Sequence, residues 1–275
     1  MKKYLSFAAF ALMLAAGVFT LAACGSDDDD NNDNGGGGSK FETQDITVNG
    51  VTFKMVAVQG DKFLMGAAED DTDAYDDEKP QHRVYLSGYY IGETEVTQAL
   101  WEAVTGENPS SIKGKNLPVT RVSHEDCVNF ARKLCEMTGK KFRLLTEAEW
   151  EYAARGGQKT KGYLYAGSNV IDEVTWFEGN AKQPQPVKGK KPNELGLYDM
   201  TGNVSEICQD DWGRKYVKDE ILADPCYTTL DTKRYCVVRG GSIESKARNC
   251  RNTTRFCAEL NFLFSNMGLR LAMDK

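Results

Sequence analysis

Apolar residues recur with a helical period along one segment in the middle of the chain. Between Ser123 and Gly139 they stand at i, i+3, i+4, i+7 and i+8, the spacing of one helix face: Cys127, Phe130, Ala131, Leu134 and Cys135. Ser123, followed three residues later by Asp126, resembles a capping box, and Gly139 is typical of a helix end. The pattern predicts a helix over this segment with that face buried.

Shorter elements surround this helix. Thr146 and Glu149 form a second capping box, which predicts a helix that ends at Gly156 and Gly157. A further short helix is expected over residues 97–104, and β-branched and aromatic residues predict strands over residues 51–58 and 84–91. Beyond residue 157 we expect mostly loops, short strands and turns. The chain as a whole therefore contains few long helices.

The N-terminal segment differs in composition from the rest of the chain. Two lysines precede an apolar run over residues 4–23, which ends in Leu-Ala-Ala before Cys24. This order resembles a bacterial lipoprotein signal, so we expect residues 1–23 to be a signal peptide and Cys24 to carry the lipid; a transmembrane helix is the alternative. Residues 24–40 are acidic and Gly-rich, which predicts a solvated tether, and residues 41–275 are long enough for one domain.

The acidic run directly behind Cys24 also suggests a location. It resembles the export tag of surface-displayed lipoproteins in some Gram-negative bacteria. We therefore expect an outer-membrane lipoprotein, periplasmic or surface-exposed, that is held at the membrane by its lipid anchor.

Composition and charge exclude several classes of function. The chain has 34 Lys and Arg against 40 Asp and Glu, a net charge of −6, so it lacks the basic excess of nucleic-acid-binding proteins and no nucleic-acid partner is expected. His82 and His124 are its only histidines, which excludes a three-histidine metal site. The sequence also contains no H-E-x-x-H, G-x-S-x-G or G-x-x-x-x-G-K-[ST] motif.

Seven short motifs, in a fixed order, resemble the formylglycine-generating enzyme (sulfatase-modifying factor) family. They include Arg-Gly-Gly-Ser at 239–242 and Gly-Leu-Arg-Leu at 268–271, and together they span most of residues 50–273: residues 63–66, 93–97, 118–120, 142–157, 196–204, 239–242 and 268–271. The resemblance implies an α+β, C-type-lectin-like fold with little regular secondary structure. That expectation agrees with the few helices that the periodicity predicts.

The same resemblance bears on catalysis. Catalytic members of the family are oxidases that use O2 and a Cu(I) ion held by two thiolates, which lie three and eight residues after the serine of Arg-Gly-Gly-Ser. In this chain those positions are Ser245 and Cys250. A hydroxyl is a hard ligand that does not replace a thiolate on Cu(I), so copper is not expected and Cys250 is expected to pack as a small apolar residue. A shifted copper site, with Cys250 paired to Cys257 or Cys236, is the alternative.

A calcium site is a second implication of the family resemblance. The family binds Ca²⁺ through two side chains and two backbone carbonyls, which correspond here to Asp199 and Glu206 and to the carbonyls of Gly202 and Val204. Hard oxygen donors at this spacing suit calcium, which would be structural. The alternative is that the two acids only cap turn amides.

Seven cysteines remain after Cys24, an odd number that leaves at least one free thiol. We expect Cys127, on the core face of its helix, to be buried and reduced. Cys226 and Cys236 flank a short loop and are the expected disulfide, because an exported protein permits one.

These observations leave two functional hypotheses. The first is a non-catalytic binding or structural module in the cell envelope that presents its loops to a protein, peptide or glycan. The alternative is a copper-dependent formylglycine-generating oxidase that matures sulfatases, in which Cys250 would be catalytic.

Overall fold

The computed structural model describes residues 42–213, 215–229 and 235–275, all of which belong to one compact unit. The predicted signal peptide, Cys24 and the tether lie outside these residues. Within the part of the chain that is described, no helix is both long and apolar enough to cross a membrane.

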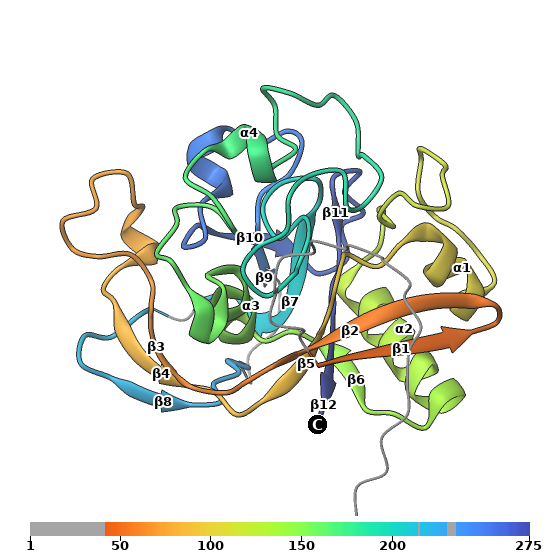
Figure 1. The fold of residues 1–275 in the computed structure, drawn as a ribbon, viewed down its shortest axis with the longest axis horizontal. Helices are drawn as coiled ribbons and strands as arrows, with labels where there is room; N and C mark the ends of the chain where they lie inside the picture. The colour runs from red at the N-terminus through yellow and green to blue at the C-terminus, as the bar shows by residue number, and fades with distance from the viewer. Residues whose placement is uncertain (1–41, 214, 230–234) are drawn as a thin grey trace, which may run out of the picture. The chain divides into compact units, whose positions relative to one another are not determined.

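The largest sheet is antiparallel throughout and combines both ends of the domain. The strand closest to the C-terminus lies between two strands from earlier in the chain (Figure 1). Its order is β1 (Thr43–Val48), β2 (Val51–Val58), β5 (Tyr89–Gly92), β12 (Leu271–Asp274) and β6 (Phe142–Leu144).

Two smaller sheets complete the strand content. One has four strands in the order β10 (Arg255–Glu259), β9 (Tyr235–Arg239), β7 (Ser205–Asp211) and β11 (Met267–Gly268). The other has three strands in the order β3 (Lys62–Met65), β4 (His82–Tyr85) and β8 (Ile221–Ala223).

The predicted helices are confirmed, with their caps. Ser123 caps α2 (His124–Thr138) through a complete capping box with Asp126, and the helix ends at Gly139 in the left-handed conformation. The other α-helices are α1 (Gln98–Thr105), α3 (Glu147–Ala154) and α4 (Ile171–Val174). Three short 3₁₀ turns accompany them: η1 (Asp76–Glu78), η2 (Gly157–Lys159) and η3 (Ala247–Cys250).

One strand prediction is wrong in extent. The expected strand over residues 84–91 is two strands, β4 and β5, which pair in different sheets. The break falls at residues 86–88, where Gly60 approaches so closely that a Cβ atom on it would lie 2.2 Å from the Leu86 carbonyl oxygen. The chain changes sheets at this close contact, which apolar periodicity alone does not reveal.

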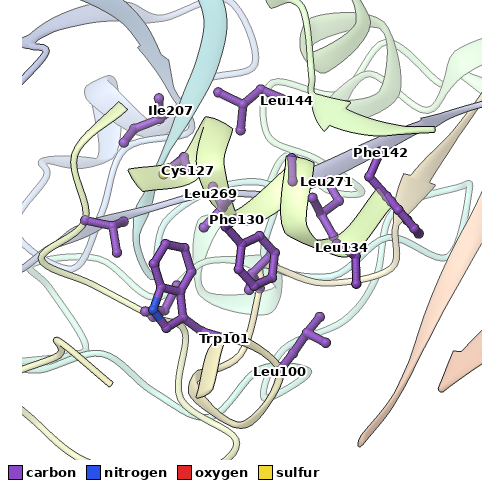
Figure 2. Packing of buried hydrophobic residues seen from close by; sticks show 14 of the residues in the cluster. Leu100, Trp101, Cys127, Phe130, Leu134, Phe142, Leu144, Ile207, Leu269 and Leu271 are labelled. Atoms are coloured by element: carbon purple, nitrogen blue, oxygen red, sulfur yellow. The ribbon is translucent and has the colours of Figure 1, made fainter. Parts of the chain in front are cut away.

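The predicted apolar face of α2 forms one centre of the core (Figure 2). Phe130 stacks on Trp101 of α1 with ring centroids 4.7 Å apart and planes at 3°. Cys127 and Leu134 are fully buried on the same face, so Cys127 is buried and carries a free thiol, as predicted. Loss of a core aromatic such as Phe130 to Ala would cost about 3–5 kcal/mol.

Candidate functional site

Four arginines are buried in the interior, and two of them, Arg239 and Arg270, belong to the family-like motifs. Their exposed fractions are between 0% and 3%, far below the usual value for arginine. Each forms an ion pair with a buried glutamate: Arg239 with Glu151, Arg251 with Glu78, Arg255 with Glu147, and Arg270 with Glu206. We call these four pairs the buried ion-pair network.

Arg239 shows how the network organises the chain. Its guanidinium pairs with Glu151 of α3 and donates to the carbonyl oxygens of Thr253 and Thr254 at 2.8 and 2.7 Å. Burial alone would raise the pKa of Glu151, but the charges of Arg155 and Arg239 outweigh it and lower that pKa. The pair therefore fixes the segment before β10 against α3, which is a structural role.

Sequence reasoning missed these acids as network members. Glu147 and Glu151 lie in a short helix whose eight residues are all buried, and of the acids in this helix only Glu149 was predicted to have a role, as a capping residue. A helix with acids on every side has no apolar face that could be buried alone, so burying it requires a hydrogen-bond or ion-pair partner for each carboxylate. The acid-rich sequence of this helix was therefore the signal that could have indicated the buried ion pairs.

Glu206, one of the predicted calcium ligands, belongs to the network. Its Oε1 accepts from Arg270 Nη2 at 2.7 Å and from Arg270 Nε at 2.9 Å, and its Oε2 accepts from Trp150 Nε1 at 2.7 Å. Both carboxylate oxygens are therefore engaged by donors from within the protein.

Asp199 is placed differently from Glu206. It is buried, its Oδ2 accepts from the Lys188 amide at 2.8 Å, and its Oδ1 has no hydrogen-bond partner in the described part of the chain. Burial raises the pKa of Asp199 to about 6. The buried Oδ1 of Asp199, which has no hydrogen-bond partner, fits a cation, whereas both carboxylate oxygens of Glu206 already accept hydrogen bonds. The predicted set of four calcium ligands therefore suits calcium only in part. No three His, Cys, Asp or Glu side chains cluster as metal ligands within the described ranges. Calcium binding stays a prediction.

The two positions that correspond to the family copper ligands meet at Gly241. A Cβ atom built on Gly241 would lie 2.9 Å from Cys250 Sγ and 3.3 Å from Ser245 Cβ. Ser245 Oγ accepts a hydrogen bond from the Ser242 amide at 3.0 Å. We call Gly241, Ser245 and Cys250 the Gly241 corner. The structure thus brings residues 245 and 250 together, and one of them carries a hydroxyl in place of a thiol.

Cys250 lies in an apolar setting. It is fully buried in a small cluster with Tyr165 and Val174, and burial, followed by the charge of Glu178, raises the pKa of its thiol to about 12. Of the cysteines in the alternative copper pairs, Cys236 packs in a different core cluster from Cys250 and Cys257 is exposed on β10, and copper binding stays untested. Cys250 is therefore a neutral, buried thiol, as expected for a packing residue.

The predicted disulfide between Cys226 and Cys236 is wrong. Both thiols are free, as are the other five cysteines of the described residues. Strand β9 turns Cys236 into the core, where its thiol donates to the Ala258 carbonyl, while Cys226 is exposed. A disulfide needs two closely placed side chains that point toward each other, whereas Cys236 is buried against Ala258 and Cys226 is exposed.

Comparison with known proteins relates this geometry to a family. Residues 42–275 match the family model of the sulfatase-modifying factor enzyme 1-like domain. The chain is 35% identical over 209 residues to the chaperone protein LppX of Paenibacillus barcinonensis, which covers 58% of this chain and 71% of that protein. It is 29% identical over 286 aligned positions to the formylglycine-generating enzyme of Streptomyces coelicolor, with 80% and 88% covered. The solved structure of Treponema denticola variable protein 1 superposes with a TM-score of 0.76 at 30% identity, over 85% of this chain and 99% of that one.

Proposed function

Since the chain belongs to the sulfatase-modifying factor enzyme 1-like family, we propose that it uses the scaffold of that family to bind a partner and does not oxidise sulfatase cysteines. In this proposal the lipidated Cys24 anchors the protein to the cell envelope. The domain then presents its surface loops to a protein, peptide or glycan.

One observation carries this proposal: a serine occupies one side of the Gly241 corner. Cu(I) prefers soft thiolates in a low coordination number, and the corner offers the single thiol of Cys250. The hydroxyl of Ser245 is hard, neutral and already hydrogen-bonded to the Ser242 amide. These residues do not fit a cuprous ion, so we derive no oxidation step for this chain.

Two further observations agree with a binding role. The buried ion-pair network holds the family fold although the thiol pair is incomplete, so the scaffold does not depend on copper chemistry. One relative is named a chaperone, and chaperones act by binding other proteins. The lipoprotein-like sequence before residue 42 would place such a module in the envelope.

Copper binding tests the proposal. We expect purified wild-type chain to retain no stoichiometric Cu(I) against a competing chelator and to leave the cysteine of a sulfatase-motif peptide unoxidised in the presence of O2. The Ser245→Cys variant restores a second thiol beside Cys250 and is expected to gain about one Cu(I) per chain. Ser245→Cys combined with Cys250→Ala is the matched control and should lose that ion. One-to-one copper in the wild type that disappears in Cys250→Ala, with peptide oxidation, would refute the proposal.

A structural calcium ion at Asp199 is a separate proposal. The orphaned Oδ1 of Asp199 would be one ligand and the carbonyls of Gly202 and Val204 two others, with Glu206 shared with Arg270. We expect millimolar Ca²⁺ to raise the melting temperature of chelator-treated protein by about 2 °C. The Asp199→Asn variant should show no such rise, and an unchanged wild-type melting curve would end the proposal.

A further inference from the structure

A cavity of about 450 Å³, whose lining includes none of the Gly241 corner residues, lies between the turn after β7 and the 3₁₀ turn η1. Its lining includes Trp212 and Tyr216, which we call the aromatic wall, Asp76 and Asp77, which we call the acidic wall, and Arg255. The volume falls in the range of small-ligand sites.

The aromatic wall is held rigidly. Arg255 is 3% exposed, and its guanidinium carbon lies 4.8 Å from the Trp212 ring centroid and 4.3 Å from that of Tyr216. Glu147 fixes the guanidinium through two hydrogen bonds of 2.7 and 2.6 Å. His82 packs against Tyr216 with ring centroids 4.4 Å apart. The two rings therefore have little freedom to collapse into the cavity.

Arg255 also contacts the acidic wall. Arg255 Nη1 donates to the Asp77 carbonyl oxygen at 3.2 Å, so one buried side chain positions both sides of the cavity. Burial raises the pKa of Asp77, although the charge of Arg255 opposes this. A cavity with fixed walls binds a ligand at a lower entropic cost than a surface that must first be ordered.

The chemistry of the lining selects a class of ligand. Among the described lining residues, the positive charge of Arg255 is balanced by Glu147, and the two carboxylates of Asp76 and Asp77 equal in number the two ammonium groups of Lys79 and Lys215. The lining is thus close to neutral, offers both hydrogen-bond donors and acceptors, and includes flat aromatic surface. A neutral ligand with vicinal hydroxyls and one apolar face satisfies all three properties, and a sugar ring is such a ligand.

We propose that this cavity binds a neutral sugar residue of a glycan, with Trp212 as the stacking platform and Asp76 and Asp77 as acceptors for its hydroxyls. This inference rests on the proposed binding function. Of the three partner classes given there, protein, peptide and glycan, it selects the glycan. It makes Trp212, Gly213 and Lys215, which follow β7, part of the recognition surface.

Fluorine NMR of the full chain labelled with 5-fluorotryptophan tests this site. The chain has four tryptophans, at 101, 150, 176 and 212, so each resonance can be assigned by substitution. The probes are glucose, N-acetylglucosamine and their linear oligomers of two to six units. We expect at least one of them to shift the Trp212 resonance in a saturable manner and to leave the Trp101 and Trp150 resonances in place.

Variants separate binding from folding. Trp212→Ala should weaken binding by at least about tenfold, measured by calorimetry. Asp77→Asn keeps the size of the side chain and removes only the charge of a carboxylate on an exposed residue that is partly screened from water, so it should fold normally and weaken binding severalfold. Trp176→Phe lies outside the cavity and is the matched control. No Trp212 shift with any of these sugars, or a Trp212 shift produced only by peptides, overturns the proposal. Neither result changes the copper measurements on the Gly241 corner, which test the proposed function separately. A failure of the sugar site can therefore be distinguished from a failure of the proposed function.

Discussion

The buried ion-pair network and the Gly241 corner each include residues of the family motifs, yet they differ in what this chain retains. Every arginine of the network finds a buried glutamate, with carboxylate and guanidinium in hydrogen-bond contact. The Gly241 corner keeps its glycine in the left-handed conformation and one thiol, but a serine stands where the second thiol would be.

The contrast separates residues that hold a fold from residues that perform chemistry. Loss of one partner from a buried ion pair leaves a charge in a medium of low dielectric, which costs several kcal/mol. Exchange of a thiol for a hydroxyl of similar size at the Gly241 corner costs little stability. A chain can therefore keep the fold of the family while the residues at the positions of its copper ligands change.

Disruption of the network should give the largest effect. In Glu151→Gln the paired Arg239 and Arg155 lose a buried carboxylate, so we expect the free energy of unfolding to fall by about 3–5 kcal/mol. Thermal denaturation should show a melting temperature lower by about 10 °C. Arg132→Gln breaks an exposed pair with Glu136 and is the matched control, with an expected loss below about 0.5 kcal/mol. Similar losses in both variants would contradict the assigned role of the network.

A pH effect should come next in size. Asp210 accepts hydrogen bonds from the amides of Glu147 and Tyr227, and burial raises its pKa to about 7 from an ordinary value near 4. The folded state therefore binds more protons than the unfolded state between these values, so stability falls as pH rises from about 4 to about 7, by on the order of 2–4 kcal/mol for this group.

The Asp210→Asn variant isolates that contribution. Urea denaturation at pH 5 and pH 8 should show a smaller difference in unfolding free energy than in the wild type, whatever the absolute stability of the variant. An identical pH dependence in both proteins would show that Asp210 titrates outside this range.

The smallest effect is expected at the Gly241 corner. Cys250→Ala removes one buried sulfur from a small cluster with Tyr165 and Val174, so we expect a loss of only about 1 kcal/mol. Chemical denaturation measures it directly. A loss as large as that of Glu151→Gln would mean that the corner supports the fold to the same degree as the network, and the comparison between the two regions would fail.

The sequence alone determined the local elements and the residue at position 245. Helix α2, its Ser123 cap and its Gly139 end follow from short-range spacing, because caps and apolar faces depend on residues within a few positions of one another. The serine at position 245 is likewise visible without coordinates. So is the order of the family motifs, which led correctly to the α+β fold.

Only the tertiary structure decided which groups meet. Arg239 and Glu151 are 88 positions apart in the chain, and Arg251 and Glu78 are 173 apart, so no local pattern indicates these pairs. The same reason explains why Glu206, predicted as a calcium ligand, was found beside Arg270 and Trp150, and why the expected Cys226–Cys236 disulfide was wrong. Ion pairs, metal ligands and disulfides depend on distance and direction in space, which packing of the whole core sets.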